Sequence, residues 1–386
     1  MLRRVPLAWI NLVADKRRCL VCVGGIAFAV LLMFMQIGFL NALLDGTVAI
    51  IDQFDADIVL TSRSKYSLVV NAPFDRHYLY AVQGFEGVSS AAPLFIEYAR
   101  SMWRLPGSGL PPRPIRAIGF DPGQPVFLLP EVNRSAPLLK RRNTVLFDAK
   151  SKDIFGQPQV GQQAELGNQA VELVGLFELG TDFVNDGNVL MSDRTFARLF
   201  PRARTPYDSL SYVELGLVRL EPEADVEAVK KALSKAVDPE LSVFTKEEYR
   251  HKERHFWLTH TPVGFVFGLG TAIGFIVGMV ICYQILSSDV ADHLAEYATL
   301  KAIGYRDAYL NLVVLQEGVY LALMGFVPGW FASYLLYVQL SFQTGLPMRI
   351  TWPRGVLVFV LTLLMCVLSG LLAVRKVRTA DPADVF

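Results

Sequence analysis

The chain has 386 residues, of which 52% are hydrophobic and 19% are charged, and its formal net charge is +1. This composition is more apolar than that of a typical soluble domain, and it offers no basic stripe for nucleic-acid binding. Four stretches are long and apolar enough to cross a bilayer, so the sequence predicts an α-helical membrane protein.

The first stretch begins after a basic N-terminal segment. Residues 1–18 predict a cytoplasmic interfacial helix that opens after Pro6, although a plain polar lead-in is the alternative. Residues 19–44 carry no charged side chain and predict transmembrane helix 1. A cleaved signal peptide fits poorly, because the apolar run is too long and no small-residue cleavage site follows.

Residues 45–260 are too polar for lipid and predict a folded aqueous domain of α+β class. Residues 41–54 are expected to prolong the first helix, and residues 105–114 to form a loop. Strands are expected at 56–63, 89–103, 115–120 and 211–220, helices at 74–82, 225–237 and 245–257, and a β-rich insert at about 122–206. The helix at 245–257 is expected to continue directly into the second span. All four cysteines lie in or beside spans, so no disulfide is expected in the domain: Cys19, Cys22, Cys282 and Cys366.

The rest of the chain alternates apolar spans with short polar segments. The predicted parts are transmembrane helix 2 at 261–286, a cytoplasmic coupling segment at 287–307, transmembrane helix 3 at 308–338, a short periplasmic loop at 339–354, transmembrane helix 4 at 355–374 and a cytoplasmic tail at 375–386. The limits of helix 3 are the least defined. Transmembrane helix 2 carries glycines whose spacing favours close helix packing, either within the chain or against a second copy: Gly264, Gly268, Gly270, Gly274 and Gly278. The simpler alternative is that membrane helices tolerate glycine.

The distribution of basic residues predicts the orientation. Five basic residues precede the first span and three follow the fourth, whereas the loop between spans three and four has only Arg349 and Arg354. Short basic flanks favour the cytoplasm. Both termini are therefore predicted to be cytoplasmic, and the large domain to be periplasmic.

Polar residues that could carry chemistry are sparse. His251, His255 and His260 invite a metal hypothesis, but HKERH is not the H-E-x-x-H zinc motif, and a polar juxtamembrane helix explains them better. No P-loop motif and no G-x-S-x-G motif occurs. We therefore expect no catalytic, cofactor-binding or metal-binding residue, and the protein is not expected to be an enzyme.

Glu317 is the one charge in the third span. If the span begins at Ala308, its carboxylate lies roughly 13 Å inside at about 1.5 Å per residue. That position is costly unless the group is paired or protonated. The alternatives are an interfacial anchor or a proton-coupled transporter, and the latter interpretation would depend on this residue alone.

The coupling segment raises a separate question. Asp289, Asp292, Glu296 and Thr299 share one helix face, and Gly304 then favours a helix stop. Such a helix offers a rigid docking surface, whereas a solvated connecting turn would need no partner.

Four motifs in this order resemble those of ABC transporter permeases of the MacB and FtsX type. EYATLKAIGY (296–305) is similar to the family's E-x-x-x-L-[KR]-A-[IL]-G segment after the second span, and is closest to the DevC-like branch. PLAWINL (6–12), LQEG (315–318) and RTADPADVF (378–386) resemble the family's N-terminus, third span and tail.

The resemblance implies four transmembrane helices, a large MacB-like periplasmic domain between helices 1 and 2, and a homodimer in the bacterial inner membrane. It implies mechanotransmission, in which ATPase motion drives the periplasmic domain. Because this chain has no Walker motif, ATP and Mg would bind a separate ATPase subunit. By position, the residues contacting that subunit would be Glu296, Tyr297, Leu300, Lys301, Ala302, Ile303 and Gly304, with Trp9 and Asn11.

The implied function is the permease of a tripartite exporter. Its partners would be a periplasmic membrane-fusion adaptor and, indirectly, a TolC-like outer-membrane channel, and its substrate a lipid or glycolipid. Two alternatives share the fold: a lipoprotein-releasing permease and an ATPase-driven regulator of a cell-wall hydrolase. An unrelated membrane sensor is a further alternative.

Overall fold

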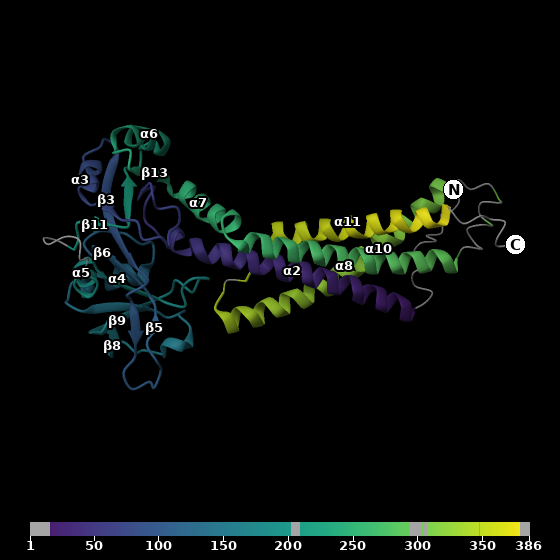
Figure 1. Ribbon diagram of the computed structural model, residues 1–386, viewed down its shortest axis with the longest axis horizontal. Helices are drawn as coiled ribbons and strands as arrows, with labels where there is room; N and C mark the ends of the chain where they lie inside the picture. The colour runs from purple at the N-terminus through teal and green to yellow at the C-terminus, as the bar shows by residue number, and fades with distance from the viewer. Residues whose placement is uncertain are drawn as a thin grey trace. The chain divides into compact units, whose positions relative to one another are not determined.

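The structure is a computed structural model that describes residues 16–201, 209–293, 299, 303, 307–346 and 348–378. The chain divides into two compact units, with boundaries after Asn41 and Thr261. One unit contains the apolar helices. The other contains the polar domain together with residues 342–347 (Figure 1).

Four helices are long and apolar enough to span a membrane. They are α2 (Lys16–Asp52), α8 (Pro262–Asp292), α10 (Asp307–Thr344) and α11 (Trp352–Arg378). The four predicted spans are therefore confirmed as long apolar helices. Each helix extends beyond its predicted span, because an apolar run marks the part suited to lipid and not the point where helical hydrogen bonding ends. The extension of the first helix past residue 41 agrees with the sequence.

The membrane unit has its own hydrophobic core. Side chains from all four helices meet in it, including Ile26, Cys282, Leu321 and Met365. Helices α8 and α11 lie side by side (Figure 1), and Ser369 Oγ of α11 donates a hydrogen bond of 2.7 Å to the Met279 carbonyl of α8. Hydroxyl-to-carbonyl bonds of this kind hold neighbouring helices together in lipid.

The polar domain is built on a mixed sheet of eleven strands. In spatial order these are β13 (Leu241–Thr245), β1 (Ile58–Ser62), β12 (Leu215–Leu220), β3 (Val88–Glu97), β6 (Arg116–Phe120), β10 (Asn188–Ser192), β7 (Thr144–Asp148), β9 (Gln169–Phe177), β8 (Gln163–Leu166), β4 (Met102–Arg104) and β5 (Arg113–Pro114). Two pairs are parallel, β6 with β10 and β7 with β9, and the other pairs of this sheet are antiparallel. Two short strands, β2 (Phe74–Asp75) and β11 (Tyr212–Val213), pair separately.

The stretch from 122 to 206, expected as a β-rich insert, contributes β7, β8, β9 and β10. These strands do not form a sheet of their own. They continue the main sheet between β6 and β4, so the described part of this stretch shares a sheet with the rest of the domain.

Side chains at alternate strand positions point to opposite faces of the sheet, and each face has its own hydrophobic core. Ile58 and Leu60 lie in the first core, which also holds side chains of α3 (His77–Gln83), α5 (Asp193–Leu199) and α6 (Val226–Ala236). Val59 lies in the second core, with α4 (Pro130–Leu139), α7 (Lys246–Thr259) and the C-terminal part of α2. Burial on both faces explains why these strands are nearly continuous apolar runs. It also places α2 and α7 on the same face.

Helix α7 has a defined start and a defined stop. A capping box joins Thr245 and Glu248 at its first turn. The helix ends at Thr259, and α8 begins at Pro262. The expectation that α7 continues directly into the second span is therefore wrong in detail, because proline lacks an N–H donor and disfavours helical geometry at Thr261.

Candidate functional site

The predicted ATPase-coupling residues lie mostly outside the described residues: Trp9, Asn11, Glu296, Tyr297, Leu300, Lys301, Ala302 and Gly304. Ile303 is described, and its side chain is 71% exposed. The coupling surface therefore stays a prediction.

The glycines of α8 divide into two groups. A Cβ added to Gly278 would lie 2.6 Å from Ala29 Cβ and 2.2 Å from Met365 Sδ, so this position permits the close approach of α2, α8 and α11. Gly270 and Gly274 also face α2. In contrast, a Cβ at Gly268 would meet nothing within 4 Å, and Gly264 is half-buried.

Close packing of α10 on α2 depends on glycines that the sequence analysis did not select. A Cβ added to Gly325 would lie 2.5 Å from Ile26 Cγ2, and one added to Gly329 would lie 2.7 Å from the Ala27 carbonyl oxygen. The four-residue spacing of Gly325 and Gly329 is the signal that could have identified them.

Glu317 lies inside the apolar stretch Asn311–Thr344 of α10, and its side chain is only 1% exposed. The helix is close to α11 at this level, since a Cβ added to Gly318 would lie 3.1 Å from the Cys366 carbonyl oxygen. The carboxylate is therefore buried between helices, and its depth in the membrane, intramembrane or interfacial, stays a prediction.

The three histidines singled out in the sequence are exposed: His251 and His255 lie on α7, and His260 follows its last residue. His255 and His260 have ring centroids 6.1 Å apart. Within the described residues, no group of three His, Cys, Asp or Glu side chains could hold a metal ion.

A cluster of ion pairs and hydrogen bonds joins α7 to the end of α2, and we call it the stalk clamp (Asp45, Asp52, Lys246, Arg250 and Arg254). Arg250 Nε donates to Asp52 Oδ1 at 2.8 Å, and an Arg254 guanidinium nitrogen donates to Asp45 Oδ1 at 2.6 Å. The basic residues are four apart in sequence, so they share one face of α7. The clamp therefore joins the two helices over two turns.

Lys246 closes the clamp at the C-terminus of α2. Its Nζ donates to the carbonyls of Asp52 and Phe54, at 3.0 and 2.6 Å. A cation at this end of a helix satisfies free carbonyls and complements the helix dipole. Partial burial lowers the pKa of Lys246, and the nearby carboxylates of Asp52 and Asp55 oppose that effect.

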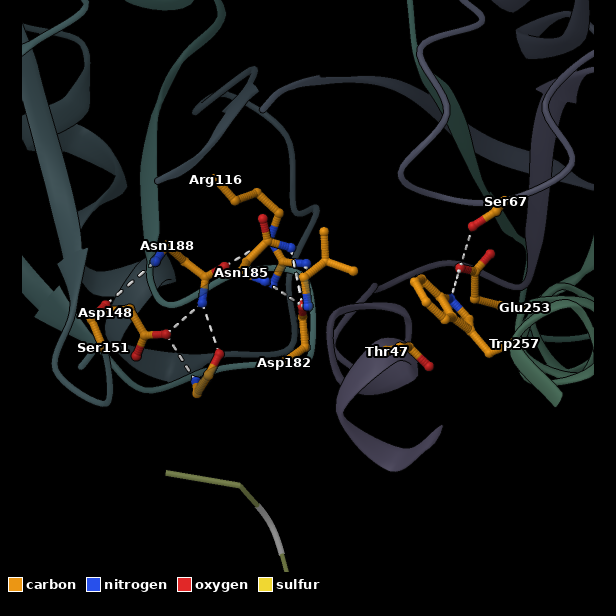
Figure 2. Close-up of polar contacts among 12 residues, drawn as sticks. Thr47, Ser67, Arg116, Asp148, Ser151, Asp182, Asn185, Asn188, Glu253 and Trp257 are labelled. Atoms are coloured by element: carbon orange, nitrogen blue, oxygen red, sulfur yellow. Dashed lines mark hydrogen bonds and ion pairs between the residues drawn. The ribbon is translucent and has the colours of Figure 1, made fainter. Parts of the chain in front are cut away.

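Glu253 anchors α7 to the segment that follows β1. Its buried carboxylate accepts hydrogen bonds from Ser67 Oγ at 2.7 Å and from Trp257 Nε1 at 2.9 Å (Figure 2). A third comes from the Leu68 N–H at 2.8 Å. Burial raises the pKa of Glu253, although these three hydrogen bonds favour the charged form.

A second buried cluster lies in and around the loop between β9 and β10, and we call it the loop network (Arg116, Asp148, Asp182, Asn185 and Asn188). Arg116 donates to Asn188 Oδ1 and to Asp182 Oδ2, both at 2.7 Å (Figure 2). Asp148 accepts from Asn188 Nδ2 at 2.6 Å and from the Gly180 N–H at 2.8 Å. The network thereby links β6, β7 and β10 to the loop 178–187.

The loop contacts the stalk helices and a distant segment of the chain. A Cβ added to Gly46 of α2 would lie 3.4 Å from Asp182 Cα, and one added to Gly345 would lie 3.0 Å from Thr181 Oγ1. The Phe183 ring packs edge-on against Trp257 of α7, with centroids 6.4 Å apart. One loop therefore contacts α2, α7 and the segment after α10.

Sequence reasoning missed both clusters. The clamp could have been suspected from basic residues at four-residue intervals in KEEYRHKERHFW, and the loop from the Asp- and Asn-rich GTDFVNDGN between two strands. The ion pairs of the stalk clamp are partly exposed, whereas those of the loop network are buried. Charge-assisted hydrogen bonds are the stronger ones, so the two clusters fix α7 against the end of α2 and the loop against the sheet.

Comparisons with known proteins match most of the chain. Residues 20–236 match the family described as MacB-like periplasmic core domain, and residues 266–382 match the FtsX-like permease C-terminal family. No curated protein matches the chain.

Two solved structures are similar to about half of the chain. The periplasmic region of MacB from Actinobacillus actinomycetemcomitans is 9% identical with a TM-score of 0.36, over 52% of this chain and 92% of that chain. The extracellular domain of the noncanonic ABC-type transporter YknZ from Gram-positive bacteria is 14% identical with a TM-score of 0.36, over 49% of this chain and 100% of that chain.

Proposed function

Because the chain belongs to the family of ABC transporter permeases that join a MacB-like periplasmic core domain to an FtsX-like permease domain, we propose that it works by mechanotransmission. It is a multi-pass membrane protein with an extracytoplasmic domain, and members of this family bind no cofactor themselves. The stalk clamp carries the proposal. Helix α2 is one helix from Lys16 to Asp52, and its C-terminal part is fixed to α7 by ion pairs.

In this proposal the force comes from a separate ABC ATPase subunit that binds ATP and Mg. The subunit contacts the segment after α8, through Glu296, Tyr297, Leu300, Lys301, Ala302, Ile303 and Gly304, and the N-terminal residues Trp9 and Asn11. The exposed Ile303 side chain is consistent with a docking surface. Both termini and this segment are cytoplasmic, as the basic flanks indicate.

The cargo proposal follows the similarity of EYATLKAIGY to the DevC-like branch. The permease acts as a homodimer in the inner membrane. Its periplasmic domain meets a membrane-fusion adaptor that leads to a TolC-like outer-membrane channel, and the substrate is a lipid or glycolipid. Co-purification separates this assembly from its alternatives: an adaptor with a coiled-coil hairpin supports it, whereas a lipoprotein or a cell-wall hydrolase contradicts it.

The test of coupling is a pair of substitutions in the cytoplasmic segment. Leu300→Glu and Gly304→Arg place a bulky charge on the proposed ATPase surface, and we expect each to reduce stimulation of the partner ABC ATPase by about tenfold, the equivalent of about 1.4 kcal/mol. ATP hydrolysis of the co-purified complex in detergent is the measurement.

Val160→Glu is the matched control, because Val160 is an exposed apolar residue of the polar domain. It should leave stimulation unchanged. Full stimulation by the Leu300→Glu and Gly304→Arg complexes would contradict the coupling role.

A further inference from the structure

The loop 178–187 is held close to two points where the chain enters or leaves an apolar span. Thr181 lies against Gly345, which directly follows the span ending at Thr344. Phe183 lies against Trp257, and Pro262, where the next span begins, is only five positions further along the chain. Five residues reach at most about 18 Å even when fully extended. The covalent chain therefore tethers this loop to the ends of two apolar spans.

The tip of the loop presents apolar side chains outward. Phe183 is 59% exposed and Val184 is 44% exposed. The Asp182 carboxylate accepts hydrogen bonds of 2.8 Å from the N–H groups of Val184 and Asn185, and the Asp182 N–H donates to the Asn185 carbonyl at 3.0 Å. These bonds close a tight turn. The loop network behind it fixes the base of the turn, so the two apolar side chains cannot fold inward.

Further apolar side chains surround the last turn of α7 beside this tip. The Tyr66 ring lies 5.4 Å from the Phe256 ring and is itself 57% exposed, and Leu258 is 42% exposed. Because consecutive helical residues point about 100° apart, Phe256, Trp257 and Leu258 face different sides of the helix. We define the aromatic collar as Tyr66, Phe183, Val184, Phe256 and Leu258; the Trp257 ring, which is only 8% exposed, lies beneath it and supports Phe183.

We propose that the aromatic collar is a lipid-binding surface that seats the extracytoplasmic domain in the interfacial layer of the outer leaflet. Aromatic side chains are favoured at this depth because their rings are apolar and their edges are polar. We favour lipid over a protein partner as the occupant of the collar. The short connections to two spans hold the collar beside lipid whether or not a partner is bound. Lipid binding by the collar does not depend on the cargo or on the ATPase.

The surface provides the domain with a contact to the membrane in addition to its covalent connections. Movement of α7 would then be guided along the bilayer surface, since the collar surrounds the end of that helix. Lipid binding would also explain the role of the loop network, because the network keeps Phe183 and Val184 at a fixed place relative to the sheet.

The test measures the depth of a fluorescent probe on the full chain. The four native cysteines are replaced by serine, and Val184→Cys, which keeps Phe183, carries an environment-sensitive nitrobenzoxadiazole label. The protein is reconstituted into vesicles of phosphatidylethanolamine and phosphatidylglycerol with nitroxide-labelled lipids. We expect a blue-shifted emission and several-fold stronger quenching by nitroxides near the headgroup than for the same label at Val160→Cys, a position that is 59% exposed.

Phe183→Asp in the Val184→Cys background should abolish the excess quenching, because a carboxylate does not enter the interfacial layer. Two results would overturn the proposal. Equal access of iodide to the labels at 184 and 160, without quenching by lipid nitroxides, would mean that the tip is in water. Protection from both iodide and lipid nitroxides would mean that protein, either a second copy or another subunit, covers the collar.

Discussion

The carboxylate of Asp182 accepts hydrogen bonds from Arg116, from the Asn185 side chain and from two backbone N–H groups. Arg116 and Asp182 have side chains that are only 3% and 4% exposed. A buried ion pair adds little net stability compared with apolar residues, but removing one partner leaves the other charge buried without compensation. The function of such a pair at this loop is to fix its geometry.

We predict that Asp182→Asn lowers the free energy of unfolding by about 3–5 kcal/mol, because the guanidinium of Arg116 loses its carboxylate in a buried site. Asp186→Asn is the matched control on the same loop. Its partner Lys152 is 41% exposed and Asp186 is 43% exposed, so the loss should be less than about 1 kcal/mol. Thermal unfolding in detergent, followed by near-UV circular dichroism, measures both. Equal losses would show that the loop network does not hold this turn.

At the scale of the element, α8 has two different faces. The face with Gly270, Gly274 and Gly278 packs on neighbouring helices, whereas the opposite face exposes Phe265, Leu269 and Ile276. A helix with so much exposed apolar surface suits lipid or another membrane helix. The glycine pattern alone does not distinguish the faces, because both carry glycines at four-residue spacing.

We predict opposite effects for leucine at two glycines of α8. Gly278→Leu places side-chain atoms where Ala29 and Met365 already lie, so it should destabilise the membrane unit by about 1–3 kcal/mol or more. Gly268→Leu meets no neighbour within 4 Å and removes a poor helix former, so it should be neutral or slightly stabilising. The midpoint of thermal unfolding in detergent checks both variants. A loss at Gly268→Leu as large as at Gly278→Leu would contradict this assignment of the faces.

For the whole molecule, the basic residues that flank the spans predict which parts of the chain lie on each side of the membrane. We predict that a cysteine at Val160→Cys in a cysteine-free chain reacts with a membrane-impermeant maleimide added to spheroplasts. A cysteine at Lys16→Cys should react only after the membrane is disrupted. Both positions are exposed, so access to reagent and not burial decides the result. Labelling of Lys16→Cys in intact spheroplasts would contradict the predicted orientation.

The sequence by itself determined the four apolar helices, the polar domain between the first two, and the α+β class of that domain. These features depend on local periodicity and on the length of apolar runs. Both can be recognised within a stretch of about 20 residues, without knowledge of the rest of the chain. The four ordered motifs likewise indicated the MacB and FtsX type, and the matches over residues 20–236 and 266–382 agree. The coupling residues stay a prediction from resemblance.

Only the tertiary structure decided which residues meet. Arg254 and Asp45 are 209 positions apart, and Arg116 and Asp182 are 66 apart, yet each pair makes a direct hydrogen bond. Periodicity reports whether a side chain is buried but not its partner, because the partner depends on strand order and helix placement across the whole domain. The stalk clamp, the loop network and the aromatic collar exist only because β1, β6 and β10 share one sheet and α2 and α7 pack on the same face of it.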